Sequence, residues 1–336
     1  MSKLIRTLIK KDSSCLPVWF MRQAGRYLPE FQKIRLKNKN FIKLCLNSDL
    51  SSEITLQPIK RFDLDAAIIF SDILMVPFAL GQKVEFKKDF GPLLSNLNID
   101  NILNYNENEF IKKLQPVYKA IAKTRKNLRK DKSLISFIGS PWTLIVYMLG
   151  LKVEKNIINK DLFLKKEKEI NLILKKINHC LCAHIKNQID AGADVVQVFD
   201  SWASLIPKEN LENYCYKPNL ELVNFCKKRN IPVICFPKGI GKDYLNFVKY
   251  VKPDGISIDY DLDPEWARKN LENTCIQGGI DPKILVKGNK QMLDEADKYL
   301  KIFKDYPYIF NLGHGLLPET NPDNVLKLIK FIRDEK

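Results

Sequence analysis

The segment PVWFMRQAGRYLPEF, residues 17–31, decides between two folds that are otherwise compatible with the chain. It begins with a short apolar run, Val18–Met21, that is typical of a buried strand, and it continues as RQAGRYLPEF. An open, doubly wound sheet that binds a dinucleotide requires a G-x-G-x-x-G turn after its first strand. The turn after Met21 lacks this glycine pattern, so the sequence favours the alternative, a closed barrel.

Short apolar runs alternate with longer amphipathic stretches on either side of this segment. The short runs indicate strands buried on both faces, and the longer stretches indicate helices. Alternation of this kind predicts a parallel sheet, and about eight such units predict an α/β fold made of one (β/α)₈ TIM barrel domain over residues 1–336. The predicted strands are Val18–Met21, Ala66–Phe70, Leu134–Gly139, Asp194–Phe199, Val233–Phe236, Gly255–Ile258, Cys275–Gly278 and Tyr308–Leu312. The predicted helices include Phe110–Arg129, Leu164–Ile189, Leu211–Arg229, Met292–Lys304 and Asn324–Arg333.

The composition is that of a globular protein with an excess of positive charge. Hydrophobic residues make up 45% of the chain, which is enough apolar surface to offset the entropy of ordering it. The formal net charge of +16 is compatible with a nucleic acid, a membrane surface or an acidic small substrate as partner. The lysines are spread over many predicted helices and form no single basic stripe, so we expect no nucleic-acid-binding face.

The cysteines and the N-terminal segment indicate a cytoplasmic protein. Eight cysteines without the spacing of a small disulfide scaffold are typical of free thiols in a reducing compartment. The N-terminal segment MSKLIRTLIKKDSSC has no apolar core followed by a cleavage site. No run approaches the roughly 20 apolar residues that cross a bilayer, so we expect no membrane span.

Polar side chains capable of chemistry follow nearly every predicted strand. The carboxyl ends of the strands carry the active site in TIM barrels, whereas loops in general are polar for other reasons. The density of such side chains at this one end favours a functional site. They are Arg22, Arg26, Ser71, Asp72, Tyr147, Asp200, Ser201, Lys238, Asp259, Tyr260, Asp281 and His314.

Two of these motifs combine cations with a carboxylate. Arg22 and Arg26 flank Gly25, and their planar guanidinium groups suit carboxylates or phosphates, although each could equally form a structural salt bridge. Asp72 directly follows an apolar strand and could be a general acid or base, a metal ligand or an acceptor for substrate N–H groups. Capping of the next helix is the structural alternative, and Ser71 could do this and leave Asp72 free.

The remaining candidates have structural alternatives of similar weight. Tyr147 could reach a ligand with its hydroxyl, but a tyrosine at such a position is more often part of the core. Asp200 and Ser201 end another strand, and capping the next helix would explain them equally well. His314 stands between two glycines and could bind a ligand at the barrel mouth.

Two further motifs are weak. HCLCAH, residues 179–184, resembles a metal site, but four ligands on one helix in this arrangement cannot converge on one ion. KGIGKDY, residues 238–244, resembles a phosphate loop without the required G-x-x-x-x-G-K-[ST] spacing. We therefore predict no metal site.

The segment PVWFMRQAGRYLPEF resembles the N-terminal signature of the uroporphyrinogen decarboxylase family. FSDIL, GSPWTL followed by Tyr147, VFDSWA, QGGIDP and NLGHGLLPETNPDNV are similar to further blocks of that family, in the same order. The resemblance extends from Pro17 to Arg333. It departs from the family at Gly279, where the family usually has Asn.

This resemblance implies a (β/α)₈ barrel that forms a homodimer with its two clefts facing one another. It implies an enzyme without metal, prosthetic group or other cofactor. The expected reaction removes four acetate carboxylates from uroporphyrinogen III, an octacarboxylate macrocycle, and gives coproporphyrinogen III in haem biosynthesis.

The resemblance also assigns roles to particular residues. Asp72 is expected to accept hydrogen bonds from the pyrrole N–H groups and to stabilise a cationic intermediate, and Arg22 and Arg26 to hold carboxylates, one of them with a part in proton delivery. These three are the predicted catalytic residues. The predicted substrate-binding residues are Arg22, Gln23, Ala24, Gly25, Arg26, Arg35, Phe70, Asp72, Phe137, Tyr147, Ser201 and His314.

Two other functions remain as alternatives at this stage. A zinc-dependent corrinoid or thiol methyltransferase would use a barrel of the same superfamily, but it would hold zinc through His and a late Cys, and no cysteine follows Cys275. A non-catalytic tetrapyrrole or nucleic-acid binder would use the basic surface. The complete set of Arg22, Arg26 and Asp72 argues against a chain that has lost its activity.

Overall fold

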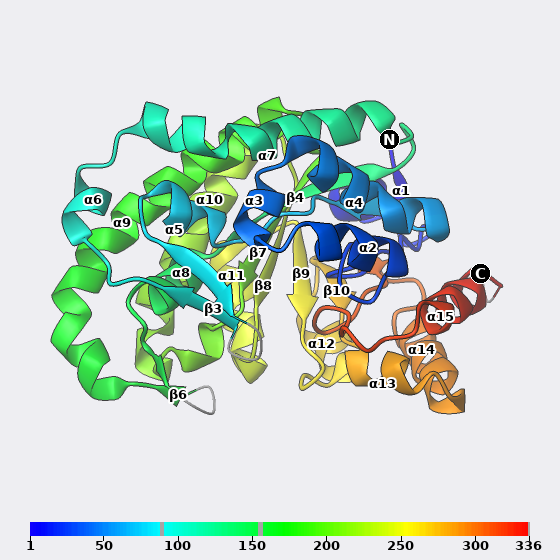
Figure 1. The fold of residues 1–336 in the computed structure, drawn as a ribbon. Coiled ribbons are helices and arrows are strands. Elements are labelled where there is room, and N and C mark those ends of the chain that lie inside the picture. Colours follow the sequence, from blue (N-terminus) through cyan, green and yellow to red (C-terminus); the bar gives the residue numbers. More distant parts are fainter. Residues whose placement is uncertain (88–90, 154–156, 335–336) are drawn as a thin grey trace.

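The computed structural model describes residues 1–87, 91–153 and 157–334, and its centre is a curled parallel sheet surrounded by helices (Figure 1). Seven strands are hydrogen-bonded in the order β1-β4-β7-β8-β9-β10-β11, and each neighbouring pair is parallel. This confirms the predicted α/β barrel fold. The strands are β1 (Ala66–Ile68), β4 (Ser133–Gly139), β7 (Val195–Asp200), β8 (Val233–Pro237), β9 (Gly255–Ile258), β10 (Cys275–Gly278) and β11 (Tyr308–Ile309).

The eighth position of the ring is filled by a short segment rather than by the predicted strand Val18–Met21. Only Val18 forms a bridge, to Phe310, and the Phe310 N–H donates to Pro17 O at 2.9 Å. On the other side, the Asp65 N–H donates to Val18 O at 2.9 Å, directly before β1. The backbone pairing does not extend to Met21 because side chains bind these N–H groups: that of Val18 donates to Asp65, that of Phe20 to Gln23 and that of Met21 to Asn311. The segment nevertheless joins β11 to β1 and closes the ring.

Helices cover the outside of the sheet, as the periodicity predicts, with small shifts at their ends. The predicted helix Leu211–Arg229 is divided into a π-helical turn, Glu212–Tyr216, and α10. The long helices are α4 (Ser48–Arg61), α7 (Glu107–Asn127), α9 (Lys160–Asp190), α10 (Lys217–Lys227), α14 (Lys290–Ile302) and α15 (Pro322–Asp334). The shorter ones are α1 (Lys3–Lys10), α2 (Pro29–Lys37), α3 (Phe41–Cys45), α5 (Met75–Ala79), α6 (Ile99–Leu103), α8 (Pro141–Met148), α11 (Tyr244–Val251), α12 (Pro264–Asn270) and α13 (Pro282–Lys287).

Two small antiparallel pairs lie outside the barrel and were not predicted. They are β2 (Val84–Lys87) with β3 (Gly91–Leu94), and β5 (Lys152–Val153) with β6 (Ile157–Ile158). Both pairs are short inserts between barrel units, so they carry little periodic signal. Within the described residues no helix is both long and apolar enough to cross a bilayer.

The barrel interior is filled by apolar side chains with one polar layer. Leu4 and Leu8 of α1 plug the end of the barrel where the strands begin, and a Cβ on Gly255 would lie 2.8 Å from Leu8. Above them, the fully buried Gln277 accepts from the Trp19 indole at 2.9 Å and donates to the Ser257 hydroxyl at 2.7 Å. Because both polar groups of Gln277 are satisfied, this layer fixes the register of the segment at residues 17–19 against β9 and β10.

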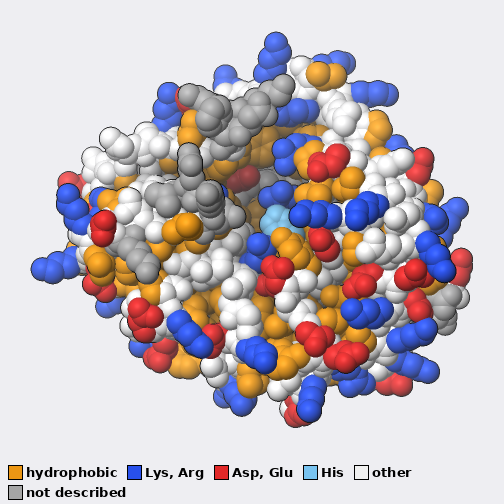
Figure 2. All heavy atoms as spheres, turned by 90° about the horizontal axis from the view of Figure 1, so that it is seen from below, with side chains coloured by type: hydrophobic (Ala, Val, Ile, Leu, Met, Phe, Trp, Pro, Cys, Tyr) orange, Lys and Arg blue, Asp and Glu red, His pale blue; other side chains and the backbone are white. Residues whose placement is uncertain are grey.

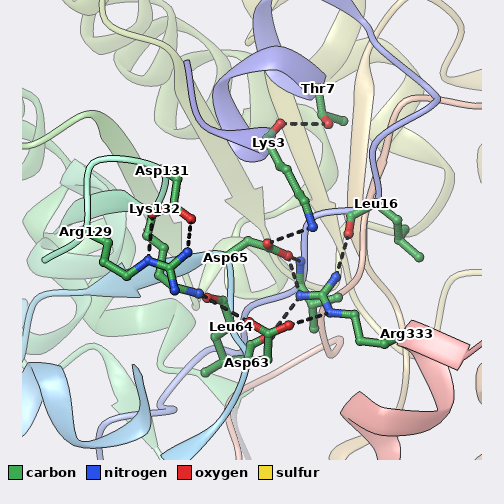
Figure 3. A network of polar contacts seen from close by, with 11 residues as sticks. Lys3, Thr7, Leu16, Asp63, Leu64, Asp65, Arg129, Asp131, Lys132 and Arg333 are labelled. Atoms are coloured by element: carbon green, nitrogen blue, oxygen red, sulfur yellow. Dashed lines mark hydrogen bonds and ion pairs between the residues drawn. The ribbon is translucent and has the colours of Figure 1, made fainter. Parts of the chain in front are cut away.

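A network of charged side chains closes the same end of the barrel (Figure 3). The Asp65 carboxylate accepts from the Val18 N–H at 2.8 Å and pairs with Arg333 of α15 at 2.6 Å. Its side chain is only 10% exposed. Asp63 pairs with the same Arg333 at 3.5 Å, but its side chain is 72% exposed. The Arg333 guanidinium group therefore contacts two carboxylates, one buried and one exposed to solvent.

We predict that the two carboxylates of this network differ in their effect on stability. Asp65→Ala is expected to lower the free energy of unfolding by about 3 kcal/mol, because it leaves the buried Val18 N–H without an acceptor and removes the close ion pair of the half-buried Arg333. The matched control Asp63→Ala is expected to cost less than about 1 kcal/mol, because solvent screens this pair. Urea denaturation followed by circular dichroism measures both, and equal losses would show that closure at Val18 does not depend on Asp65.

Candidate active site

The two arginines lie on a turn that is strained at its first residue. Arg22 has a φ of 61°, a left-handed conformation that costs a non-glycine residue roughly 1–2 kcal/mol. Its side chain runs across Gly315, where a Cβ would lie 2.4 Å from Arg22 Cδ, and the Leu316 N–H donates to Met21 O at 2.9 Å. The glycine after His314 therefore allows the Arg22 side chain to lie against the loop that follows β11.

The Gln23 side chain holds this turn in place. Its side chain accepts from the Phe20 N–H and donates to Ala66 O, both at 2.9 Å, and the residue has no exposed surface. Ala24 is half-buried and Gly25 is buried, whereas Arg26 is exposed. Arg26 has no ion pair with any other residue in the described ranges.

Asp72 lies beside Arg22 and keeps part of its carboxylate available. One oxygen accepts from the Leu74 N–H at 2.9 Å. Among the described residues no side chain caps the following helix, α5, so the alternative of capping by Ser71 or Asp72 is not observed. The second oxygen has no hydrogen bond within the described residues. Desolvation raises the pKa of Asp72 to about 6, although the Leu74 N–H and the charge of Arg22 oppose this rise. Asp72 is still mainly ionised at neutral pH. Its poorly solvated surroundings strengthen the electrostatic interaction of this carboxylate with a nearby charge.

Arg22 and His314 respond to the same surroundings. Desolvation and the neighbouring Arg26 lower the pKa of Arg22. Desolvation lowers the pKa of His314 to about 4, and the charges of Arg22 and Lys238 act in the same direction. His314 is therefore neutral at physiological pH and contributes hydrogen bonding rather than positive charge.

Tyr147 and Ser201 are held together by contacts between α8 and the end of β7. The Thr143 hydroxyl donates to Asp200 at 2.7 Å and accepts from the Trp202 N–H at 3.1 Å. The Tyr147 ring packs against Trp202 with centroids 5.9 Å apart. Burial raises the pKa of the Tyr147 hydroxyl, so this hydroxyl stays protonated and can donate a hydrogen bond.

Asp200 does not belong to the exposed part of the site. It is 1% exposed and bound to Thr143, and burial raises its pKa. The expected capping role is also not observed, because α8 and not the following helix supplies its partner. Ser201, the next residue, is half-buried. Asp200 therefore positions the Ser201–Trp202 turn from behind.

The predicted aromatic residues form the apolar part of the surroundings. Phe70 packs against Phe31 and Phe41 with centroids 5.5 and 5.9 Å apart, and Phe137 packs against Phe199 at 5.7 Å. The Arg35 guanidinium lies 5.9 Å from the Phe41 ring centroid and donates to Asn38 O at 2.5 Å. One N–H donor of Arg35 is thus used by the carbonyl at the end of its own helix. Arg35 lies on the side of the site where Phe70 lies.

The face that carries the strand ends is hollowed. Figure 2 shows a depression with Lys and Arg side chains and one His side chain along its edge and acidic atoms inside it. Lys238, which directly follows β8, belongs to this face through its effect on His314. Its position after a strand was the only sequence signal for it, and it was not among the predicted binding residues.

In the described residues, neither weak motif has the arrangement of the site that it resembles. His179 is exposed and lies 3.1 Å from Glu107, whereas the buried His184 is 2.9 Å from the Tyr118 hydroxyl, so the imidazoles of HCLCAH point to different neighbours. In KGIGKDY, the Gly239 N–H donates to Asp259 at 2.7 Å. In the described part of the chain, no three His, Cys, Asp or Glu side chains are placed to hold a metal ion.

Gly279, where the sequence departs from its resemblance, is explained by Tyr299. Gly279 has a φ of 117°, and a Cβ there would lie 2.5–2.9 Å from the Tyr299 ring. The ring of Tyr299 thus occupies the space that a side chain at residue 279 would need. A glycine at residue 279 and a tyrosine at residue 299 are therefore sterically compatible in the loop after β10.

Comparisons with known proteins agree with one family over the whole chain. The family model described as "Uroporphyrinogen decarboxylase (URO-D)" matches residues 1–335. A uroporphyrinogen decarboxylase from Rickettsia bellii is 42% identical over 339 residues and covers 98% of both chains. One from Orientia tsutsugamushi (strain Boryong) is 41% identical and covers 99% of this chain and 98% of that protein.

Solved structures show likeness in fold alone. A methyltransferase from Methanosarcina mazei superposes with a TM-score of 0.79 at 15% identity, covering 99% of this chain and 97% of the other. A B12-independent methionine synthase from Shewanella sp. W3-18-1 gives a TM-score of 0.51 at 11% identity, covering 95% and 96%. At such low identity these matches carry no information about activity.

The raised pKa of Asp72 predicts a pH-dependent difference between the wild type and Asp72→Asn. Between pH 3.8 and about 6 the folded protein binds a proton at Asp72 that the unfolded chain has released, so this group stabilises the fold at low pH and loses that effect as pH rises through 6. Relative to the wild type, Asp72→Asn is therefore expected to gain about 1 kcal/mol of stability between pH 5 and pH 7.5. Urea denaturation at a series of pH values measures this, and a pH-independent difference would mean that Asp72 titrates normally.

Proposed function

The chain belongs to the uroporphyrinogen decarboxylase family, whose members are carboxy-lyases of haem (tetrapyrrole) biosynthesis, and we propose that the hollow at the strand ends is its active site. The substrate there is uroporphyrinogen III, and the product is coproporphyrinogen III after loss of four acetate carboxylates. No metal or prosthetic group takes part in the proposed reaction. The observation that carries the proposal is a desolvated but ionised Asp72 whose carboxylate keeps one oxygen open and whose charge interacts with that of Arg22.

The reaction requires a place for the electron pair that loss of CO₂ leaves behind. Protonation of a pyrrole ring carbon produces an iminium-like ring, and this ring accepts the electron pair when the bond from the acetate methylene carbon to CO₂ breaks. A second proton on the methylene carbon then completes the methyl group, and loss of the proton first added to the ring carbon restores the neutral pyrrole. The cationic ring is the species that the protein must stabilise.

Asp72 is suited to stabilise this cation. Its free carboxylate oxygen can accept the pyrrole N–H groups, while the Leu74 N–H fixes the other oxygen. An anion that is already oriented and poorly solvated lowers the energy of a developing positive charge without reorganisation. The raised pKa of Asp72 is the cost of keeping this carboxylate desolvated before substrate binds.

Arg22 and Arg26 bind substrate carboxylates in this proposal. Desolvation and the neighbouring charge of Arg26 lower the pKa of Arg22, which favours Arg22 as the residue that takes part in proton delivery. The neutral imidazole of His314, the protonated hydroxyl of Tyr147 and the hydroxyl of Ser201 supply hydrogen bonds to the macrocycle. Phe70, Phe137 and the stem of Arg35 complete the apolar side of the cleft.

The zinc-dependent methyltransferase alternative has no support in the site. His314 has no cysteine beside it in the sequence, and the last cysteine, Cys275, is buried in the barrel interior. Desolvation raises the pKa of the buried thiols of Cys215, Cys235 and Cys275. Such thiols are poorly suited to bind metal as thiolates.

We also propose that the protein is a cytoplasmic homodimer, in line with the family resemblance. Sedimentation equilibrium is expected to give the mass of two chains, and cell fractionation is expected to leave the protein out of the membrane pellet. A monomer at micromolar concentration, or retention in washed membranes, would contradict the respective part of this proposal.

The activity is tested by anaerobic incubation of purified protein with uroporphyrinogen III, with a chelator present and no cofactor added. Oxidised products separated by carboxylate number are expected to form a ladder from eight carboxylates to four. Asp72→Ala is expected to lower kcat by at least about a hundredfold, because the cationic intermediate loses its counter-charge.

Asp261→Asn provides the matched control, since Asp261 is an exposed carboxylate at the same end of the barrel. This variant is expected to keep wild-type turnover. Folded wild-type protein that removes no carboxylate would overturn the assignment. Full activity of Asp72→Ala would overturn the role given to Asp72 while leaving the overall reaction in place.

A further inference from the structure

Lys238 is a cation whose backbone is fixed on the side of the ring opposite the two arginines. It directly follows β8, the fifth of eight positions counted from the segment at residues 17–19. Its N–H donates to Asp200 O at 3.1 Å, and its carbonyl accepts from the Ser204 N–H at 3.2 Å. The loop after β7, which also carries Ser201, therefore sets where the Lys238 side chain starts.

The Lys238 side chain extends over the mouth of the barrel. Its ammonium lies 5.9 Å from the ring centroid of Tyr260, which follows β9. Its charge also acts on His314, in the loop after β11, although β9 and β10 stand between β8 and β11. Tyr260 adjoins this loop, because a Cβ on Gly313 would lie 2.4 Å from Tyr260 N, so Lys238 faces the same part of the barrel mouth as the loop that carries His314.

Lys238 is half-buried and has no acidic partner in the described ranges of the chain. Two other half-buried cations are paired: Arg125 contacts Asp194 at 2.7 Å, and Arg333 contacts Asp65 at 2.6 Å. A half-buried ammonium over an aromatic ring and beside a neutral imidazole gains little from its surroundings compared with a carboxylate partner. A carboxylate of a bound ligand would supply the anionic partner that the Lys238 ammonium lacks.

We propose that Lys238 binds a carboxylate of the substrate on the side of the hollow opposite Arg22 and Arg26, and so acts as a second anchor for the macrocycle. This inference rests on the proposed function. A ring held by the arginine turn at one edge extends across the hollow and presents further carboxylates there. Four rounds of decarboxylation bring different edges to this position. A rotatable ammonium on a flexible stem follows such changes better than a rigid guanidinium fork does.

The test compares Lys238→Met with Lys238→Arg and with the control Lys242→Met, which removes an exposed lysine four residues on. Lys238→Met is expected to raise the KM for uroporphyrinogen III about tenfold or more and to change kcat less than about threefold, since the lost contact is made equally in the ground and transition states. Lys238→Arg is expected to recover most of the loss, and Lys242→Met to match the wild type. Thermal unfolding checks that all three fold.

Binding of uroporphyrin III, the oxidised octacarboxylate, gives a readout without turnover. Fluorescence titration is expected to show about tenfold weaker binding to Lys238→Met, with a smaller dependence on salt than in the wild type. An unchanged KM and affinity, a loss shared by Lys242→Met, or a fall in kcat alone would overturn the anchor. Absence of turnover in the wild type would instead overturn the proposed function, so the two failures are distinguishable.

Discussion

The contact between Asp65 and Val18 is the constraint on which the site depends. It joins a short segment to β1 on one side of the ring, while Phe310 binds the same segment on the other side. Four residues after Val18 the chain reaches Arg22, so the part of the chain that closes the barrel also carries the arginine turn. The polar layer around Gln277 fixes Trp19 from inside. The position of Arg22 is therefore determined by the closure of the whole sheet and not by a mobile loop.

At three strand ends, the burial and the hydrogen bonds of an aspartate determine whether it has a structural role or can contact a ligand. Asp200 is 1% exposed and bound to Thr143, and Asp259 is 2% exposed and accepts from the Gly239 N–H and the Tyr244 hydroxyl. Asp72 accepts one local N–H and keeps its second oxygen open. The first two carboxylates hold the loops that present Ser201 and Lys238. Only Asp72 is left with acceptor capacity that a ligand can use.

The strand order and the main helices were predictable, because fully buried parallel strands leave apolar runs that a single sequence displays. The first strand was not, since the partners that limit it, Phe310 and Asp65, are distant in sequence. The same holds for Gln23, whose placement in a motif with two arginines suggested a ligand contact. Its partners include Ala66 O across the closure, which no local pattern reveals. Residue types with chemical capacity could be located at the right end of the barrel, but their hydrogen-bond partners could not.

The electrostatics of the hollow explain why its natural ligand is a polyanion. Desolvation disfavours every charged form there: it raises the pKa of Asp72, lowers that of Arg22 and keeps His314 neutral. Arg22 and Arg26 repel one another, and Asp72 offsets this repulsion only in part. A ligand with several carboxylates removes this repulsion, whereas a neutral or singly charged ring of the same size would leave most of it in place. Discrimination by charge number therefore follows from the site before any shape-dependent contact is made.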